Sequence, residues 1–190
     1  MSHHSPLLLI IMMAFLYSNS VNARSPSLAV PNVFSETALR FNLPSDLLYA
    51  IALKESGTTI IHSKTKQKRF QAWPWTMNYN KKGYFFKTRL ELYNAVQSLV
   101  NSGKRVVDVC PMQMNWRWHQ KRFDDLWQAT NPKDCIQEAA NYLVEISKMN
   151  NRNDWISIVG GYHNLNRNIG NNYANGVKRI CKQYQLNCFS

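Results

Sequence analysis

The amino-acid sequence predicts a mainly α-helical protein with one domain and one long loop. At least five segments carry apolar residues at the spacing of a helix face, whereas residues 57–86 lose that periodicity. Neither a linker rich in glycine and serine nor an internal repeat divides the 190 residues. Together these observations favour helices packed around a single core, with one irregular stretch.

Two helices are expected at the start of the domain. The first covers residues 32–41 and leads directly into the second, over residues 44–57. Pro44 suits a first helical turn, where its missing N–H costs no hydrogen bond, and Gly57 is a common stop. One face of the second helix carries apolar residues at helical spacing, namely Leu47, Leu48, Ile51 and Ala52, and Glu55 ends the same face.

Glu55 is the candidate catalytic residue. Burial and the negative end of the helix dipole both disfavour a carboxylate, so we expect the pKa of Glu55 to be raised. A raised pKa is what a general acid needs at neutral pH. From this helix alone, the alternative is a boundary glutamate that turns to solvent or pairs with a lysine or arginine.

Residues 57–86 are predicted to form a long loop, or a loop with short strands. Long loops inside compact domains are often functional, and this one carries Trp73 and Trp75. Either indole could stack on a sugar ring, or both could cover the core beneath an irregular segment. We assign a ligand-facing role to one of them at most and select Trp75.

The rest of the chain is predicted as helices and one apolar segment. Residues 106–115 are apolar, are broken by Pro111, and carry the polar Gln113 and Asn115. Pro132 opens the longest of the later helices. These helices are expected over residues 90–102, 132–150, 155–162 and 173–184.

The N-terminus predicts export. Residues 7–17 form an apolar run of signal-peptide length, too short for a permanent membrane span. Val21 and Ala23 fit a cleavage site before Arg24, although no lysine or arginine precedes the apolar run. We therefore expect a signal peptide over residues 1–23 and a mature domain over residues 24–190.

The charge and the cysteine content indicate which partners and which disulfides to expect. A formal net charge of +12 attracts polyanions, either nucleic acid or an anionic cell-wall polymer, and the signal peptide favours the wall. No zinc-finger, homeodomain or RNA-binding signature is present, so no nucleic-acid partner is expected. Four cysteines in an exported chain suggest two disulfides with three possible pairings. Cys181 and Cys188 are close enough for a local loop, which leaves Cys110 for Cys135, and the spacing fits no metal motif.

Three motifs resemble one enzyme family. Residues 50–56, Ala-Ile-Ala-Leu-Lys-Glu-Ser, resemble the Glu-Ser signature of soluble lytic transglycosylases (SLT domain), lysozyme-like enzymes that cut bacterial peptidoglycan. Residues 112–116, Met-Gln-Met-Asn-Trp, resemble the family's Gly-Leu-Met-Gln-Ile-Asn segment, and residues 161–164, Gly-Tyr-His-Asn, its Ala-Tyr-Asn segment. The motifs follow the family's order, and the resemblance covers residues 32–180. Residues 73–78 are similar to the Trp-Pro-Trp-Thr-Leu-Asn stretch of transglycosylases that serve conjugation, pilus or secretion systems.

The chain departs from the family at three positions. Cys110 stands at a glycine, Pro111 at a leucine, and Cys135 at an asparagine. Two changes to cysteine at positions that the fold should bring together favour a Cys110–Cys135 bridge. Since a glycine position often has an unusual backbone conformation, the loop beside the cleft is where the family pattern is least expected to hold.

The resemblance implies a lysozyme-like α fold, leaning toward α+β, and the activity of a lytic transglycosylase. Such an enzyme cleaves the β-1,4 bond between N-acetylmuramic acid and N-acetylglucosamine and closes a 1,6-anhydro ring. Glu55 would act first as acid and then as base, without a metal or organic cofactor. The implied partners are peptidoglycan strands and components of an envelope-spanning conjugation, pilus or secretion system. We expect a periplasmic monomer with no stable membrane anchor after signal cleavage.

The resemblance also assigns roles in the cleft. Ser56 would orient the carboxyl group, or simply cap the helix, and Tyr162 would hold the acid in place. Gln113 and Asn115 would position the saccharide, with buried structural amides as the rival interpretation. Tyr173 is expected in the core, and His163 is given no catalytic role. The substrate-binding set is therefore Ser56, Trp75, Met112, Gln113, Asn115 and Tyr162.

Two other functions remain open. A lysozyme-type hydrolase needs a second carboxylate, for which Asp108 is the nearest candidate, although a solvated or capping aspartate is the expected role. A wall-binding assembly factor without catalytic activity would use the basic, aromatic surface alone. Endo or exo action and the preferred stem peptide are not predicted.

Overall fold

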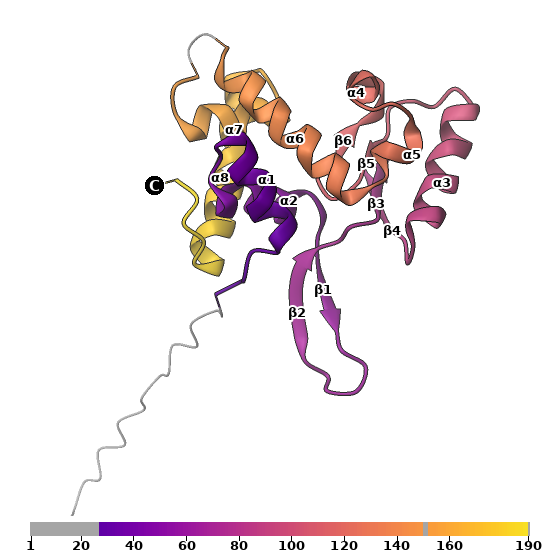
Figure 1. The fold of residues 1–190 in the computed structure, drawn as a ribbon, viewed down its shortest axis with the longest axis horizontal. Helices are drawn as coiled ribbons and strands as arrows, with labels where there is room; N and C mark the ends of the chain where they lie inside the picture. Colours follow the sequence, from indigo (N-terminus) through magenta and orange to yellow (C-terminus); the bar gives the residue numbers. More distant parts are fainter. Residues whose placement is uncertain (1–26, 150–151, 190) are drawn as a thin grey trace, which may run out of the picture.

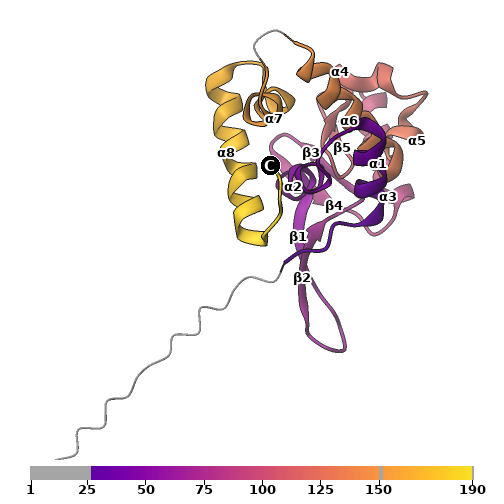
Figure 2. The same cartoon turned by 60° about the vertical axis from the view of Figure 1, so that its left-hand side comes forward.

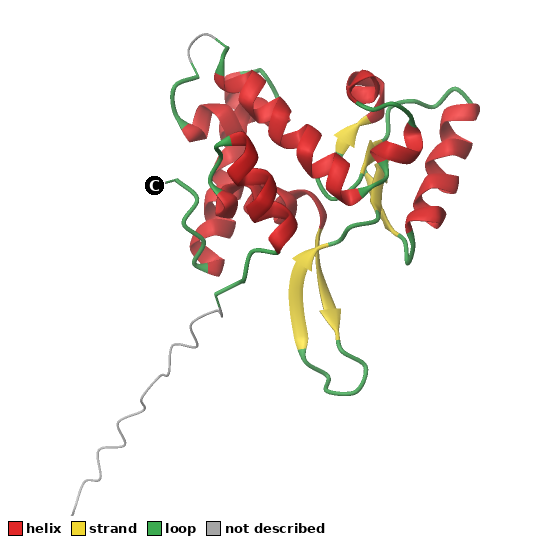
Figure 3. Cartoon of the chain, in the orientation of Figure 1, coloured by secondary structure: helices red, strands yellow, loops and turns green. Residues whose placement is uncertain are grey.

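The computed structural model describes residues 27–149 and 152–189. The predicted signal peptide, residues 1–23, lies outside the described residues. Helices dominate, and a small antiparallel sheet and a separate hairpin complete the fold, as Figures 1 and 3 show. The fold is therefore mainly α with some β, as predicted. Among the described residues, no helix combines the length and the apolar character needed to cross a membrane.

The five helices that begin at residues 32, 44, 90, 132 and 155 in the prediction are all present, with ends that differ by a few residues. The helices are α1 (Asn32–Phe41), α2 (Ser45–Ser56), α3 (Arg89–Asn101), α4 (Trp116–His119), α5 (Leu126–Ala129), α6 (Pro132–Ser147), α7 (Trp155–His163) and α8 (Arg167–Tyr184), and a short 3-10 helix, η1 (Gln120–Arg122), follows α4.

Side-chain caps explain several helix starts. The Thr88 side chain accepts a hydrogen bond from the Glu91 N–H at the start of α3, and Asn131 caps α6 ahead of Pro132. Asn166 likewise accepts from the N–H groups of Asn168 and Ile169 at the start of α8. This cap starts α8 six residues earlier than predicted, because the polar first turn carries no apolar periodicity.

The stretch without helical periodicity folds into two hairpins, so the short strands of the prediction are confirmed. β1 (Gly57–Ile61) pairs with β2 (Lys68–Ala72), and this hairpin projects from the body of the protein (Figure 1). β3 (Thr76–Tyr79) pairs with β4 (Lys82–Phe85) and joins β5 (Asp108–Val109) and β6 (Met114–Asn115) in a four-stranded antiparallel sheet of order β4-β3-β5-β6.

Helix α2 lies at the centre of the core. Every residue from Leu47 to Leu53 is buried, so the helix is enclosed on all sides and not along one stripe as predicted. It contacts α1, α8 and β2, and the turned view of Figure 2 places it between α8 and α1. Because its middle is fixed by packing, the end of α2 that carries Glu55 is held rigidly.

Two disulfides have the predicted pairing. Cys110–Cys135 joins the turn between β5 and β6 to the first turn of α6, with the Cα atoms 6.4 Å apart. Cys181–Cys188 joins the end of α8 to the C-terminal segment, with the Cα atoms 6.1 Å apart. The first bridge lies in the loop that departs from the family pattern.

Candidate active site

A cleft of about 640 Å³ brings together residues from all three motifs. The end of α2, the β5–β6 turn and the end of α7 each contribute to its lining. Gly57 lets the chain pass directly from α2 into β1, because a Cβ at that position would overlap the Leu53 carbonyl oxygen and the Phe70 ring. Its polar and aromatic lining includes Glu55, Asp108, Gln113, Asn115, Trp118, His119 and Tyr162.

Glu55 combines burial with access to the cleft. Its side chain is half-buried and lines the cleft. Burial raises the pKa of Glu55 to about 7; the charge of Asp108 also raises it, whereas the hydrogen bond from Tyr173 and the charge of Lys54 lower it. Glu55 is therefore present in both protonation states near neutral pH. The pKa is raised, as the sequence predicts.

The tyrosine that holds Glu55 is not the one predicted. Tyr173, on the inner face of α8, donates a hydrogen bond to Glu55 Oε1 over 2.5 Å, although it is also buried in the core as expected. The Tyr162 hydroxyl donates instead to the Met112 carbonyl over 2.8 Å. Tyr162 thus fixes the β5–β6 turn and lines the cleft, and Tyr173 orients the acid. The His163 ring stacks on Tyr173, with 4.5 Å between ring centroids.

Two predicted substrate-binding residues lie beneath the β5–β6 turn. The Ser56 side chain is only 2% exposed, and its hydroxyl lies within hydrogen-bond distance of the carbonyl oxygens of Ala52, at 3.0 Å, and Pro111, at 2.8 Å. Met112 is fully buried. Ser56 therefore supports the turn from the end of α2, and Met112 points into the core from within the turn, so neither side chain lines the cleft as predicted.

The turn itself contains two residues in the left-handed backbone region. Cys110 has a φ of 69° and Gln113 a φ of 50°. Gln113 closes the turn, since both its backbone N–H and its side-chain Nε2 donate to the Cys110 carbonyl. Cys110, which the resemblance aligns with a glycine, therefore has a backbone conformation that glycine favours, and a disulfide and hydrogen bonds hold it there.

Asp108 and Asn115 face each other across β5 and β6. Asn115 Nδ2 donates to Asp108 Oδ1 over 2.7 Å, while Asn115 Oδ1 is a buried acceptor without a hydrogen-bond partner among the described residues. Burial raises the pKa of Asp108, against the opposing effects of the Asn115 bond and the charge of His163. Asp108 is therefore a half-buried cleft residue, not the solvated or capping aspartate that was expected.

The exposed tryptophan of the cleft is Trp118, which sequence reasoning missed. Its side chain is 71% exposed and lines the cleft. Trp75 instead packs against the core and meets Trp73 edge-on, with 6.3 Å between ring centroids. The sequence feature that could have indicated Trp118 is its position three residues after Asn115. In the one-turn helix α4, Trp116 points inward and Trp118 points outward.

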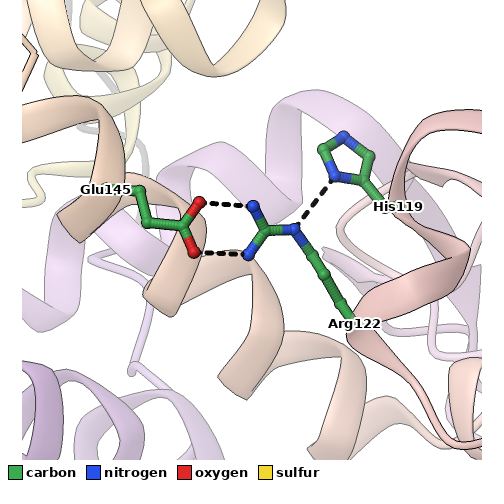
Figure 4. Close-up of polar contacts among 3 residues, drawn as sticks. All are labelled: His119, Arg122 and Glu145. Carbon is green, nitrogen blue, oxygen red and sulfur yellow. Dashed lines mark hydrogen bonds and ion pairs between the residues drawn. The ribbon is translucent and has the colours of Figure 1, made fainter.

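A polar relay connects α6 to the rim of the cleft (Figure 4). The Arg122 guanidinium pairs with both carboxylate oxygens of Glu145, and its Nε donates to His119 Nδ1 over 3.2 Å. Burial, with the charge of Arg122, lowers the pKa of His119 to about 4, against the charge of Glu145. His119 is therefore neutral near pH 7, and because Nδ1 accepts a hydrogen bond, its proton lies on Nε2. Sequence reasoning missed this relay because its members have no motif spacing.

Within residues 27–149 and 152–189, no cluster of three or more His, Cys, Asp or Glu side chains could hold a metal ion. Comparisons of the chain with protein-family models, curated proteins and solved structures found no match. The site holds one carboxyl group with a pKa of about 7, a second carboxyl group, hydrogen-bonding amides and one exposed indole. These groups are suited to acid–base chemistry on a polar ligand.

Proposed function

We propose that the protein is a peptidoglycan lytic transglycosylase with a lysozyme-like fold. The observation that carries the proposal is Glu55, held by Tyr173 in an open cleft with a pKa of about 7. A general acid works best when its pKa lies near the operating pH. The convergence of the Glu55, Met112 and Tyr162 segments on one cleft, in the order of the family motifs, supports the same assignment.

The reaction needs one residue that gives a proton and then takes one. Glu55 protonates the oxygen between N-acetylmuramic acid and N-acetylglucosamine, the C1–O4 bond breaks, and the substrate's own N-acetyl group stabilises the cationic sugar. The resulting carboxylate then removes the proton from the C6 hydroxyl as the C1–O6 bond forms. A pKa near 7 suits both half-reactions, since neither protonation state is strongly disfavoured.

The other cleft groups fit the positioning of a sugar chain. Trp118 offers an exposed ring for stacking on a pyranose, and Asn115 lines the cleft beside Asp108. Gln113 and Tyr162 keep their predicted places in the lining. The Asp108 carboxylate adds negative charge beside a sugar that becomes cationic.

Export and the biological setting are part of the proposal. Two disulfides are compatible with an oxidising compartment such as the periplasm. The Trp-Pro-Trp-Thr segment favours a role in opening the wall locally for a conjugation, pilus or secretion apparatus, by a monomer without a cofactor. A basic chain in that compartment would be attracted to the anionic wall.

One observation favours a second candidate, a hydrolase of lysozyme type. Asp108 is half-buried, lines the same cleft as Glu55, and raises the pKa of Glu55 through its charge. A two-carboxylate glycosidase requires such a partner. The transglycosylase is preferred because the three motif segments resemble that family.

Product analysis separates the two candidates. Purified sacculi digested with the protein are expected to release muropeptides that end in 1,6-anhydro rings, lighter than hydrolysed products by one water molecule. Mass spectrometry of the digest measures this difference. Reducing muramic ends would instead identify a hydrolase, and the absence of any release would favour a wall-binding factor without catalytic activity.

A further inference from the structure

A second cavity, of about 900 Å³, adjoins the cleft and shares Asp108 and Trp118 with it. The two cavities are therefore neighbours, and we describe them as the two arms of one groove. The arm outside the catalytic cleft is lined by Lys81 from the β3–β4 turn, Lys104 and Arg105 from the segment before β5, and Arg117 from α4. We call this part of the groove, with its four cationic residues, the basic arm.

The charge of the basic arm is not neutralised by neighbouring carboxylates. The one ion pair found among the described residues joins Arg122 to Glu145, outside the basic arm. Asp108 is the acidic residue of the lining, and it accepts its hydrogen bond from Asn115, a residue of the catalytic cleft. The sequence adds no acid between Glu55 and Glu91, a stretch that includes Lys81.

Aromatic rings hold two of the four cations in place. Lys104 Nζ lies 6.0 Å from the Tyr79 ring centroid, and the Arg117 guanidinium lies 5.0 Å from the Trp118 centroid. These contacts orient the side chains without removing their charge. The arrangement is suited to a ligand that carries several negative groups and continues from a polymer in the cleft.

On the basis of the proposed function, we infer that the basic arm binds the carboxylates of the peptide stems attached to the glycan. The sugar hydroxyl and acetamido groups of peptidoglycan are neutral, so the sugars alone do not require four cations. The anionic groups are the carboxylates of the stem and, where the stem has been removed, the lactyl carboxylate on the ring. Only the stem carboxylates extend away from the sugar chain, and a separate arm of the groove suits that geometry. The protein is therefore a peptide-selective enzyme that prefers substituted over naked strands.

The test compares two strand preparations and two matched double variants. The strands either keep their peptide stems or have lost them to an amidase, which leaves the lactyl carboxylates. Lys104→Ala/Arg105→Ala removes two charges from the basic arm. Lys64→Ala/Lys68→Ala removes the same charge from the β1–β2 hairpin, which projects away from β5 and α4 (Figure 1), so general attraction to the wall is matched.

The unmodified protein is expected to have a higher kcat/KM on peptide-bearing strands than on naked strands at low salt. Lys104→Ala/Arg105→Ala should lower kcat/KM on peptide-bearing strands by roughly fivefold to tenfold, and should lower the value on naked strands no more than Lys64→Ala/Lys68→Ala does. Lys64→Ala/Lys68→Ala should keep the preference. An equal loss on both strands, or no loss on either, would overturn the inference.

A binding measurement keeps the inference testable if no strand is cut. The Glu55→Gln protein, titrated calorimetrically with a soluble disaccharide-peptide and with the same disaccharide without its peptide, should bind the first more tightly. The Lys104→Ala/Arg105→Ala changes, added to Glu55→Gln, should remove that difference. Equal affinity for the two ligands would refute the inference, whereas absent cleavage with a retained difference would refute the proposed reaction alone.

Discussion

Glu55→Gln is expected to lower the rate of wall cleavage by about 10²–10⁴-fold, the range typical of a general acid. The variant keeps the size of the side chain and an oxygen that can accept the Tyr173 hydrogen bond, so the cleft should remain intact. Release of muropeptides from sacculi measures the rate. Retained activity in a folded Glu55→Gln protein would remove Glu55 from the mechanism.

The same substitution has an expected signature in stability. Because the folded pKa of Glu55 lies above its ordinary value of 4.5, the folded state binds more protons than the unfolded state between about pH 4.5 and 7. The free energy of unfolding therefore falls as the pH rises through that window. Glu55→Gln should be more stable than the unmodified protein at pH 8, by up to about 3 kcal/mol, and should show no gain at pH 4. Urea unfolding at both pH values measures the difference. A variant that is less stable than the unmodified protein at pH 8 would contradict the claim that burial disfavours the ionised form of Glu55.

Removal of the Cys110–Cys135 bridge is expected to have the largest effect on stability. The bridge spans 25 residues, so Cys110→Ala/Cys135→Ala should lower the free energy of unfolding by about 3.5 kcal/mol. Activity should fall as well, because the bridge holds the β5–β6 turn against α6. Denaturant unfolding and sacculus digestion measure the two effects.

Two control variants separate the cross-link from the conformation of the turn. Cys181→Ala/Cys188→Ala opens a bridge that spans 7 residues, for an expected loss of about 2.5 kcal/mol and unchanged activity. Cys110→Gly/Cys135→Asn also lacks the cross-link, but glycine adopts the positive φ of position 110 without strain. It should be more active than Cys110→Ala/Cys135→Ala. Equal activity in those two variants would show that the left-handed backbone at position 110 is unimportant.

Much of the helical framework could be predicted from local signals. Apolar periodicity and helix-terminal residues such as Pro44 and Pro132 locate five helices, and Glu55 stands out because it ends an apolar face. The start of α8 was missed because its first turn is capped by Asn166 and is otherwise polar. The complete burial of α2 was missed because it depends on which elements surround that helix, and periodicity within one segment does not report this.

The motifs locate the cleft, whereas the direction in which each motif side chain points depends on its neighbours in the fold. Glu55, Gln113, Asn115 and Tyr162 lie in the cleft as expected. Tyr173 has the same spacing as the core residues of α8. Nothing in the sequence therefore indicates that its hydroxyl bonds to Glu55. Ser56, Met112 and Trp75 also belong to motif segments, but their neighbours in the fold turn them inward, which membership of a motif does not indicate.

The most direct test of the account is an NMR titration of the Glu55 side-chain carboxyl carbon, assigned by comparison with Glu55→Gln. The account predicts a pKa of about 7 in the unmodified protein. It also predicts a higher pKa in Tyr173→Phe, because the Tyr173 hydrogen bond stabilises the carboxylate. A pKa near 4.5 that does not rise when the tyrosine hydroxyl is removed would contradict the claim that this fold turns Glu55 into a proton donor.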